Sequence, residues 1–197
     1  MGGQAPAPLV LASASLWRRD LLEQIGLRPD LIASSDLTEA LRAGELPPAY
    51  AKRMAAEKLT AAQARHAGAW VLAADTVVAL GRRVLPKTED RATAEDCLRS
   101  LSGRRHRVLG AIALQAPDGK TAQRLVTTRV AFKQLSAAER RAYLDSGEWA
   151  GKAGGYAIQG LAAAFIPWIN GSYSNVVGLP LPETWALFSG LGYPIAR

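Results

Sequence analysis

One carboxylate interrupts a long apolar stretch that has the character of a β-strand. Asp75 lies within residues 70–80, WVLAADTVVAL, among β-branched and small apolar residues. A carboxylate in an apolar strand is costly unless it is paired, hydrogen-bonded or bound to a metal ion. Asp75 could instead cap a turn, but strand ends are also where catalytic carboxylates lie in α/β folds. We predict that Asp75 is functional. Glu39 could be a second carboxylate for the same cation, although by itself it is more typical of an exposed loop acid.

The N-terminal stretch 9–19, LVLASASLWRR, has the layout of an anion-binding turn. A short apolar strand leads into two serines among small residues, and helical character follows up to Gly26. Ser15 is the predicted N-cap, and free N–H groups of the first helical turn favour an anion. Arg18 and Arg19 lie where the helix dipole disfavours cations, so we expect them to meet an anion. The alternative is an ordinary capped helix with two solvated arginines.

Two lysines could supply further charge for a phosphorylated ligand. Lys58 lies in an alanine-rich helical stretch, and Lys87 follows Pro86 in a turn. Each alone reads as a solvated surface lysine. Together with Arg18 they would provide the positive charge that a triphosphate needs.

A glycine-rich segment, KAGGYAIQG over residues 152–160, could receive the base of a nucleotide. Glycines allow a ligand to approach the backbone closely. Tyr156 offers an aromatic face, and the Gln159 amide can both donate and accept hydrogen bonds. The alternative is a glycine-rich hairpin without a ligand.

Composition narrows the class of protein. The chain has 197 residues with 24 Lys and Arg against 17 Asp and Glu, a net charge of +7, and one cysteine, Cys97. The charge implies an acidic partner, but the basic residues are dispersed, which disfavours a stable nucleic-acid complex. No intrachain disulfide is possible, and two histidines with one cysteine do not build a typical zinc site. No signal peptide or membrane span is apparent, so we expect a cytoplasmic protein that does not bind membranes.

Alternating strands and helices, followed by antiparallel pairs, predict an α/β fold with a mixed sheet. The expected strands are 9–12, 30–34, 70–80, 84–85, 107–115, 124–132 and 161–169. The expected helices are 16–25, 50–66, 93–101 opened by Thr93, 137–144 opened by a Ser136–Glu139 capping box, 172–177 as a turn or short helix, and 182–189. Residues 35–48 and 147–160 are predicted to be irregular, the former a mobile loop, and no linker divides the chain.

Six segments together resemble the motifs of the Maf family of nucleoside triphosphate pyrophosphatases, in order and spacing. These are LASAS-L-W-RR, AEKL, AADTVVAL, LSGRRHRV, KAGGYAIQG and INGSYSNVVGLPL, which extend from Leu9 to about Phe188. The resemblance implies one domain over 1–197, with 1–8 disordered, and a mixed twisted sheet with flanking helices. It also implies two lobes around a cleft, as in inosine triphosphate pyrophosphatases, and metal-dependent hydrolysis of a nucleoside triphosphate to monophosphate and pyrophosphate.

The resemblance also assigns roles to individual residues. Asp75 matches the proton acceptor and, with Glu39, would hold Mg²⁺ or Mn²⁺. The residues implied to bind substrate are Ser13, Arg18, Lys58, Lys87 and Lys152. The sequence departs from the usual pattern at Leu16, at Thr38 in place of an acid, and at Thr88 in place of a proline, which predicts a looser turn after Lys87.

The residues associated with base preference are mixed. Thr76 and Gln159 match the group that acts on uridine and thymidine triphosphates, whereas Trp17 matches the group that acts on 7-methyl-GTP. Gln159 can pair with the edge of uracil or thymine, and Trp17 can stack on any base. Edge hydrogen bonds discriminate more sharply than stacking, so we predict UTP and dTTP, with 7-methyl-GTP as the alternative.

A non-catalytic nucleotide-binding regulator of septum formation is a second hypothesis from the same resemblance. It would use the same pocket, but an anion site gains nothing from Asp75 without a metal. Pyrophosphate release that depends on metal separates the two hypotheses. The sequence leaves the oligomeric state open between a monomer and a homodimer.

Overall fold

The computed structural model describes residues 7–34 and 37–195, and the expected disorder of residues 1–6 lies outside them. Residues 7 and 8 also belong to the segment that was expected to be disordered. Ala7 packs on the core, and the Pro8 carbonyl accepts a hydrogen bond from Trp70 N at 2.9 Å. The strands are β1 Leu9–Ala12, β2 Leu31–Ile32, β3 Trp70–Leu80, β4 Arg83–Leu85, β5 Arg105–Gln115, β6 Thr121–Ala131 and β7 Trp168–Asn170. The helices are α1 Leu16–Gln24, α2 Pro47–Gln63, α3 Arg91–Leu101, α4 Ala137–Ser146, the 3₁₀ helix η1 Leu161–Phe165, α5 Tyr173–Val177 and α6 Leu181–Leu191.

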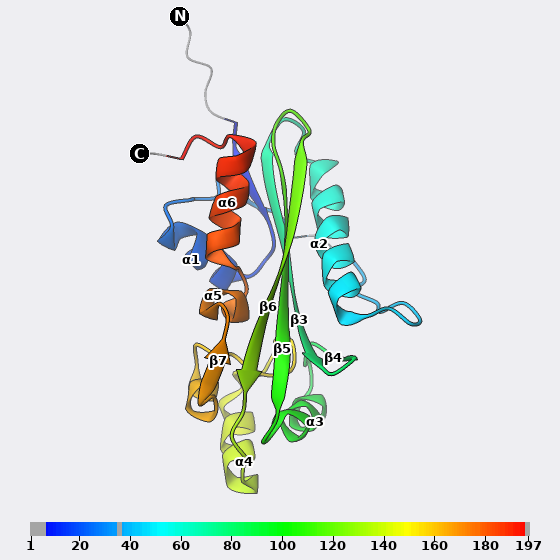
Figure 1. Ribbon diagram of the computed structural model, residues 1–197, viewed down its shortest axis with the longest axis vertical. Helices are drawn as coiled ribbons and strands as arrows, with labels where there is room; N and C mark the ends of the chain where they lie inside the picture. Colours follow the sequence, from blue (N-terminus) through cyan, green and yellow to red (C-terminus); the bar gives the residue numbers. More distant parts are fainter. Residues whose placement is uncertain (1–6, 35–36, 196–197) are drawn as a thin grey trace, which may run out of the picture.

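The predicted mixed sheet is confirmed. Its order is β2-β1-β3-β5-β6-β7, and β4 pairs with β3. β1 is parallel to both β2 and β3, and the other pairs are antiparallel. The long strands β3, β5 and β6 run the length of the molecule (Figure 1). They support two lobes, one that contains α1, α2 and α6 and one that contains α3 and α4 (Figure 1). At the tight turn between β5 and β6, Gly119 has a φ of 87°, which a residue with a Cβ rarely adopts.

Helices cover both faces of the sheet. α2 packs on one face through Ala51, Met54, Ala55 and Leu59, which share its apolar stripe. α1 and α6 pack on the opposite face, while α3 and α4 enclose a separate cluster in the other lobe that contains the buried Cys97 (Figure 1). The lobes therefore have separate apolar clusters, and the strands are their shared support.

Two local predictions were wrong, and a third was right only in part. Residues 161–169 are not one strand but η1 followed by β7, because an alanine run has low β-propensity and Pro167 lacks an N–H. Thr93 does not open α3, since Asp90 is the cap and accepts from Thr93 N at 2.8 Å. Ser15 is the N-cap residue of α1 as predicted, but its side chain makes no cap bond, and its backbone N–H donates to Ser13 Oγ at 3.3 Å.

Other helix predictions hold with shifted ends. The capping box of Ser136 and Glu139 is present at the start of α4. α2 begins at Pro47 rather than at residue 50, since proline is well suited to the first helical position. Residues 172–177 include the short helix α5.

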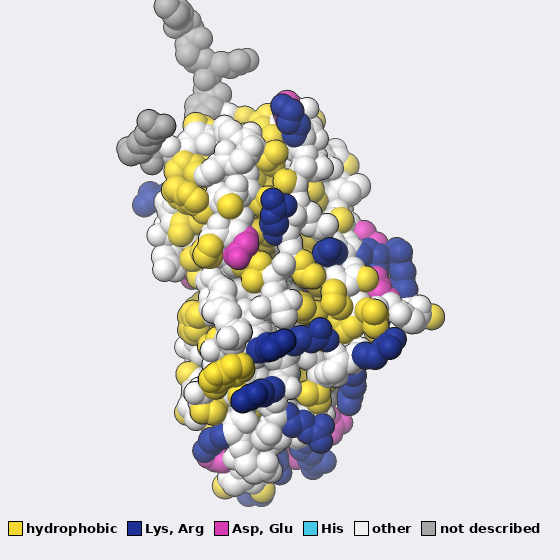
Figure 2. All heavy atoms as spheres, viewed as in Figure 1, with side chains coloured by type: hydrophobic (Ala, Val, Ile, Leu, Met, Phe, Trp, Pro, Cys, Tyr) yellow, Lys and Arg dark blue, Asp and Glu magenta, His cyan; other side chains and the backbone are white. Residues whose placement is uncertain are grey.

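The surface carries dispersed positive charge. On the face that carries β5 and β6, Lys and Arg side chains lie among apolar and neutral atoms (Figure 2). Arg105 lies over the ring of the exposed Trp168, with its guanidinium carbon 4.8 Å from the ring centroid. Within the described ranges, every helix is too short or too polar to cross a membrane.

Candidate active site

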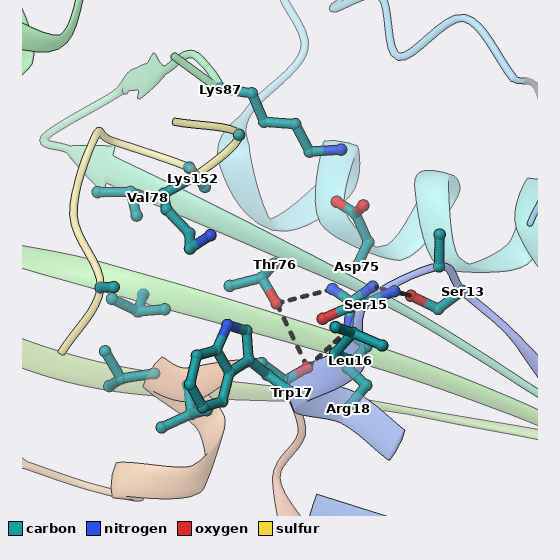
Figure 3. A pocket seen from close by; sticks show the side chains of 18 of the residues that line it. Ser13, Ser15, Leu16, Trp17, Arg18, Asp75, Thr76, Val78, Lys87 and Lys152 are labelled. Atoms are coloured by element: carbon teal, nitrogen blue, oxygen red, sulfur yellow. Dashed lines mark hydrogen bonds between the residues drawn. The ribbon is translucent and has the colours of Figure 1, made fainter. Parts of the chain in front are cut away.

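A cleft opens at a gap in the pairing of β3. One edge of β3 pairs with β1 up to Ala73 and with β4 from Val78 onward, which leaves the residues between them unpaired on that edge. Successive residues of a strand point to opposite faces, so Asp75 points toward α2 and Thr76 toward α1 and α5. A cavity of about 490 Å³ lies at this gap and takes side chains from both faces (Figure 3).

On the α2 side, ammonium groups and carboxylates alternate. Lys58 Nζ lies 2.5 Å from Asp75 Oδ1 and 2.6 Å from Glu39 Oε1. Lys87 Nζ lies 2.8 Å from the other Glu39 oxygen. Lys58 and Asp75 are buried, whereas Lys87 is half exposed at the mouth of the cavity. Every charge in this row therefore has an opposite charge as its neighbour.

The position of Glu39 depends on α2. The buried Tyr50 donates from its hydroxyl to the Glu39 carbonyl at 3.0 Å. Burial raises the pKa of Tyr50 to about 12, so the phenol keeps the proton that it donates. Partial burial alone would raise the pKa of Glu39, but the ammonium groups of Lys58 and Lys87 lower it below its ordinary value. Glu39 is thus a carboxylate held in its charged form.

On the other side of β3, the Arg18 guanidinium joins three segments. Its Nη1 donates to Ser13 Oγ at 2.9 Å, its Nη2 to Thr76 Oγ1 at 3.0 Å, and its Nε to the Gly178 carbonyl at 2.9 Å (Figure 3). Burial lowers the pKa of Arg18, and the negative charges of Asp75 and Glu39 oppose that shift. The three hydrogen bonds fix the position of the Arg18 guanidinium, and the two carboxylates favour its charged form.

Arg19 does not share this position, so the expectation that both arginines meet an anion was wrong for Arg19. Its side chain pairs with Asp20 at 2.8 Å and with Glu23 at 3.8 Å on the outer side of α1. Adjacent helical residues point in different directions, and only Arg18 lies on the side that faces the cavity.

Apolar and polar side chains also line the cavity away from the charged row. Trp17, which is 45% exposed, lies across from Lys152 (Figure 3). Gln159, from the glycine-rich segment, is another lining residue. Tyr156, within that segment, is buried, and its hydroxyl lies 2.7 Å from Nε2 of the buried His106.

All ten predicted site residues line this one cavity. They are Ser13, Trp17, Arg18, Glu39, Lys58, Asp75, Thr76, Lys87, Lys152 and Gln159. Sequence reasoning missed the carbonyl of Gly178 and the contact between His106 and Tyr156. A backbone carbonyl has no residue-type signal, although Gly178 falls within the INGSYSNVVGLPL motif.

The two carboxylates are suited to a hard divalent cation. Oxygen ligands are those that Mg²⁺ and Mn²⁺ prefer, and Mg²⁺ is often held by one or two carboxylates together with water and phosphate oxygens. In the described part of the chain, no cluster of three or more His, Cys, Asp or Glu side chains could hold a metal ion. Glu39 and Asp75 therefore fit a cation that the substrate helps to bind.

His106 gives the protein an acid-sensitive core contact. Burial lowers its pKa from 6.5 to about 4, so the unfolded state takes up the proton first. Its contribution to stability is complete above pH 6.5 and is lost as the pH falls toward 4. Between pH 7 and pH 4.5, wild type should lose about 2 to 3 kcal/mol more unfolding free energy than His106→Gln. Urea unfolding at the two pH values measures this difference. His66→Gln is the control, and an equal pH response of wild type and His106→Gln would refute the role of His106.

The chain is similar to known proteins over most of its length. A family model described as "Maf-like protein" matches residues 8–191. The chain is 62% identical over 194 residues to the dTTP/UTP pyrophosphatase of Rhodospirillum rubrum, covering 98% of this chain and 92% of that protein. It is 60% identical to the dTTP/UTP pyrophosphatase of Paramagnetospirillum magneticum, covering 95% and 98%.

A solved structure is more distantly similar. A nucleoside-triphosphatase / dITP/XTP pyrophosphatase from Mycobacterium abscessus aligns with a TM-score of 0.44 and 19% identity, covering 66% of this chain and 74% of that one.

The family match covers nearly the whole chain, from β1 to the end of α6. The relatives that match are of closely similar length. The chain therefore belongs to the Maf family.

Proposed function

We propose that this protein hydrolyses dTTP and UTP to the nucleoside monophosphate and pyrophosphate. The observation that carries the proposal is the single cavity in which Arg18, Lys58 and Lys87 lie around the carboxylates of Asp75 and Glu39. The proposal is also supported by 62% identity to a protein named dTTP/UTP pyrophosphatase.

The fixed cations suit a triphosphate. Arg18 would bind phosphate oxygens from one side of β3, and Lys58 and Lys87 from the other. These groups neutralise the charge that develops on the leaving pyrophosphate, and they are already in place before the reaction. Water attack breaks the α–β anhydride bond, and Asp75 takes the proton of the attacking water.

Asp75 and Glu39 would also hold the divalent cation. When bound, Mg²⁺ or Mn²⁺ supplies positive charge that polarises phosphate oxygens. Lys58 contacts both carboxylates and keeps them close together in the free protein. That proximity prepares the pair for a doubly charged ligand.

Trp17 and Gln159 would receive the base. Trp17 offers a stacking surface, and the Gln159 amide can satisfy the alternating acceptors and donor of uracil or thymine. A single domain over 1–197 and a cytoplasmic location remain predictions, and the oligomeric state stays open between a monomer and a homodimer.

The proposal is tested by pyrophosphate release from UTP, dTTP, ATP, GTP and 7-methyl-GTP with Mg²⁺ or Mn²⁺, with and without a chelator. We expect the highest kcat/KM for UTP and dTTP, and no release with the chelator. Gln159→Glu should lower kcat/KM for UTP, because a carboxylate cannot donate to the base carbonyl, whereas Gln24→Glu on the outer side of α1 should not. A kcat/KM for 7-methyl-GTP more than about tenfold above that for UTP would assign specificity to Trp17 and contradict the proposal.

A further inference from the structure

Two segments that line the cavity are joined to each other. The first is the turn that follows β4 and carries Lys87. The second is the glycine-rich segment that carries Lys152 and Gln159. Lys87 and Ala153 form an antiparallel bridge, and Gly154 N donates to the Pro86 carbonyl at 2.9 Å. The position of Lys87 relative to the glycine-rich segment is therefore set by one short contact.

Thr88 lies at the centre of this contact. Its backbone N–H donates to the Lys152 carbonyl at 3.1 Å, and its own carbonyl accepts from Gly151 N at 2.8 Å. Thr88 in place of a proline had predicted a looser turn after Lys87, and that prediction was wrong. The two backbone hydrogen bonds of Thr88 hold the turn in place. A proline at this position could not donate the bond to Lys152.

The side chain of Thr88 adds a second attachment. It is fully buried, and Oγ1 donates to the Trp149 carbonyl at 2.5 Å. Trp149 is held in turn by its indole N–H, which donates to the Leu144 carbonyl at 2.9 Å at the end of α4. The methyl group lies against Gly155, where an added Cβ would come within 3.2 Å of Thr88 Cγ2. The hydroxyl thus links the turn that carries Lys87 to Trp149, in the segment that follows α4.

We propose that Thr88 is a positioning residue for the nucleotide, and that its hydroxyl holds the Lys87 turn in place relative to the glycine-rich segment. This inference rests on the proposed function. Thr88 does not line the cavity, because its side chain is fully buried and its hydroxyl lies against the carbonyls of Trp149 and Lys152. Small displacements of positioning groups are known to have large kinetic effects.

The test compares Thr88→Val, which keeps the shape and removes the hydroxyl, with Thr88→Ser, which keeps the hydroxyl. Thr184→Val is the matched control. Thr184 is also fully buried, and its Oγ1 donates to the carbonyl of Pro180 at 2.8 Å, at the start of α6. We expect Thr88→Val to raise KM for UTP about tenfold with a smaller change in kcat. Thr88→Ser should remain within about twofold of wild type, and Thr184→Val should lower Tm without changing KM.

Hydrogen exchange gives a readout that does not depend on activity. Thr88→Val should speed amide exchange in residues 149–155, and Thr184→Val should leave that segment unchanged. An unchanged KM in Thr88→Val, or a Thr88→Ser variant as impaired as Thr88→Val, would overturn the positioning role while leaving the proposed function intact. A wild-type protein that releases no pyrophosphate from any triphosphate would overturn the proposed function and, with it, this inference.

Discussion

Asp75→Asn should lower the rate of pyrophosphate release from UTP by a factor of about one hundred or more, as is typical when an acid–base group is lost. The amide cannot accept the proton of the attacking water. It also removes one of the two carboxylates that fit a divalent cation. The shape of the side chain is kept, and Lys58 retains Glu39 as an ion-pair partner, so the fold should persist.

The measurement is steady-state pyrophosphate release, with thermal melting to show that the variant is folded. Asp145→Asn is the matched control, since that carboxylate forms an exposed ion pair with Arg91 on the outer side of α4. The control should have the activity of wild type. If Asp75→Asn kept near-normal turnover, Asp75 would be a structural partner of Lys58 and no more.

Much of the fold follows from the sequence because local and long-range preferences agree there. The segment 70–80 is apolar and β-branched, and it forms β3 with the predicted ends. Residues 161–169 are equally apolar, yet they form η1 and β7. Apolar composition alone does not distinguish a buried strand from a buried turn, and here the alanines and Pro167 decided the outcome.

The predicted site residues line one cavity, but the contacts among them were not predicted. Lys58 alone reads as a solvated lysine, but it occupies the apolar stripe of α2 between Met54 and Ala62 and is buried against Asp75. A helical-period count would have placed it on that face. The hydrogen bonds of Thr88 and Gly178 were not predictable, because each uses a backbone group whose partner lies far away in the chain.

Lys58→Met should have an effect as large as that of Asp75→Asn, with a different physical signature. Loss of a fixed cation at the phosphates costs about a hundredfold or more in kcat. The substitution also leaves two neighbouring carboxylates without their shared ammonium group. Breaking a buried ion pair in this way typically costs about 3 to 5 kcal/mol, so we expect the unfolding free energy to fall by about 3 kcal/mol.

Mg²⁺ should partly restore the stability of Lys58→Met, and this distinguishes it from an ordinary destabilised variant. A divalent cation would compensate the carboxylates of Glu39 and Asp75, and a ligand that binds only the folded state stabilises it. Urea unfolding with and without Mg²⁺ measures the effect in wild type, Lys58→Met and the control Lys52→Met, an exposed lysine on the same helix. Because Lys58 occupies the space between the carboxylates in wild type, Mg²⁺ should stabilise Lys58→Met more than wild type. An equal Mg²⁺ response in all three proteins would mean that Glu39 and Asp75 do not form the cation site.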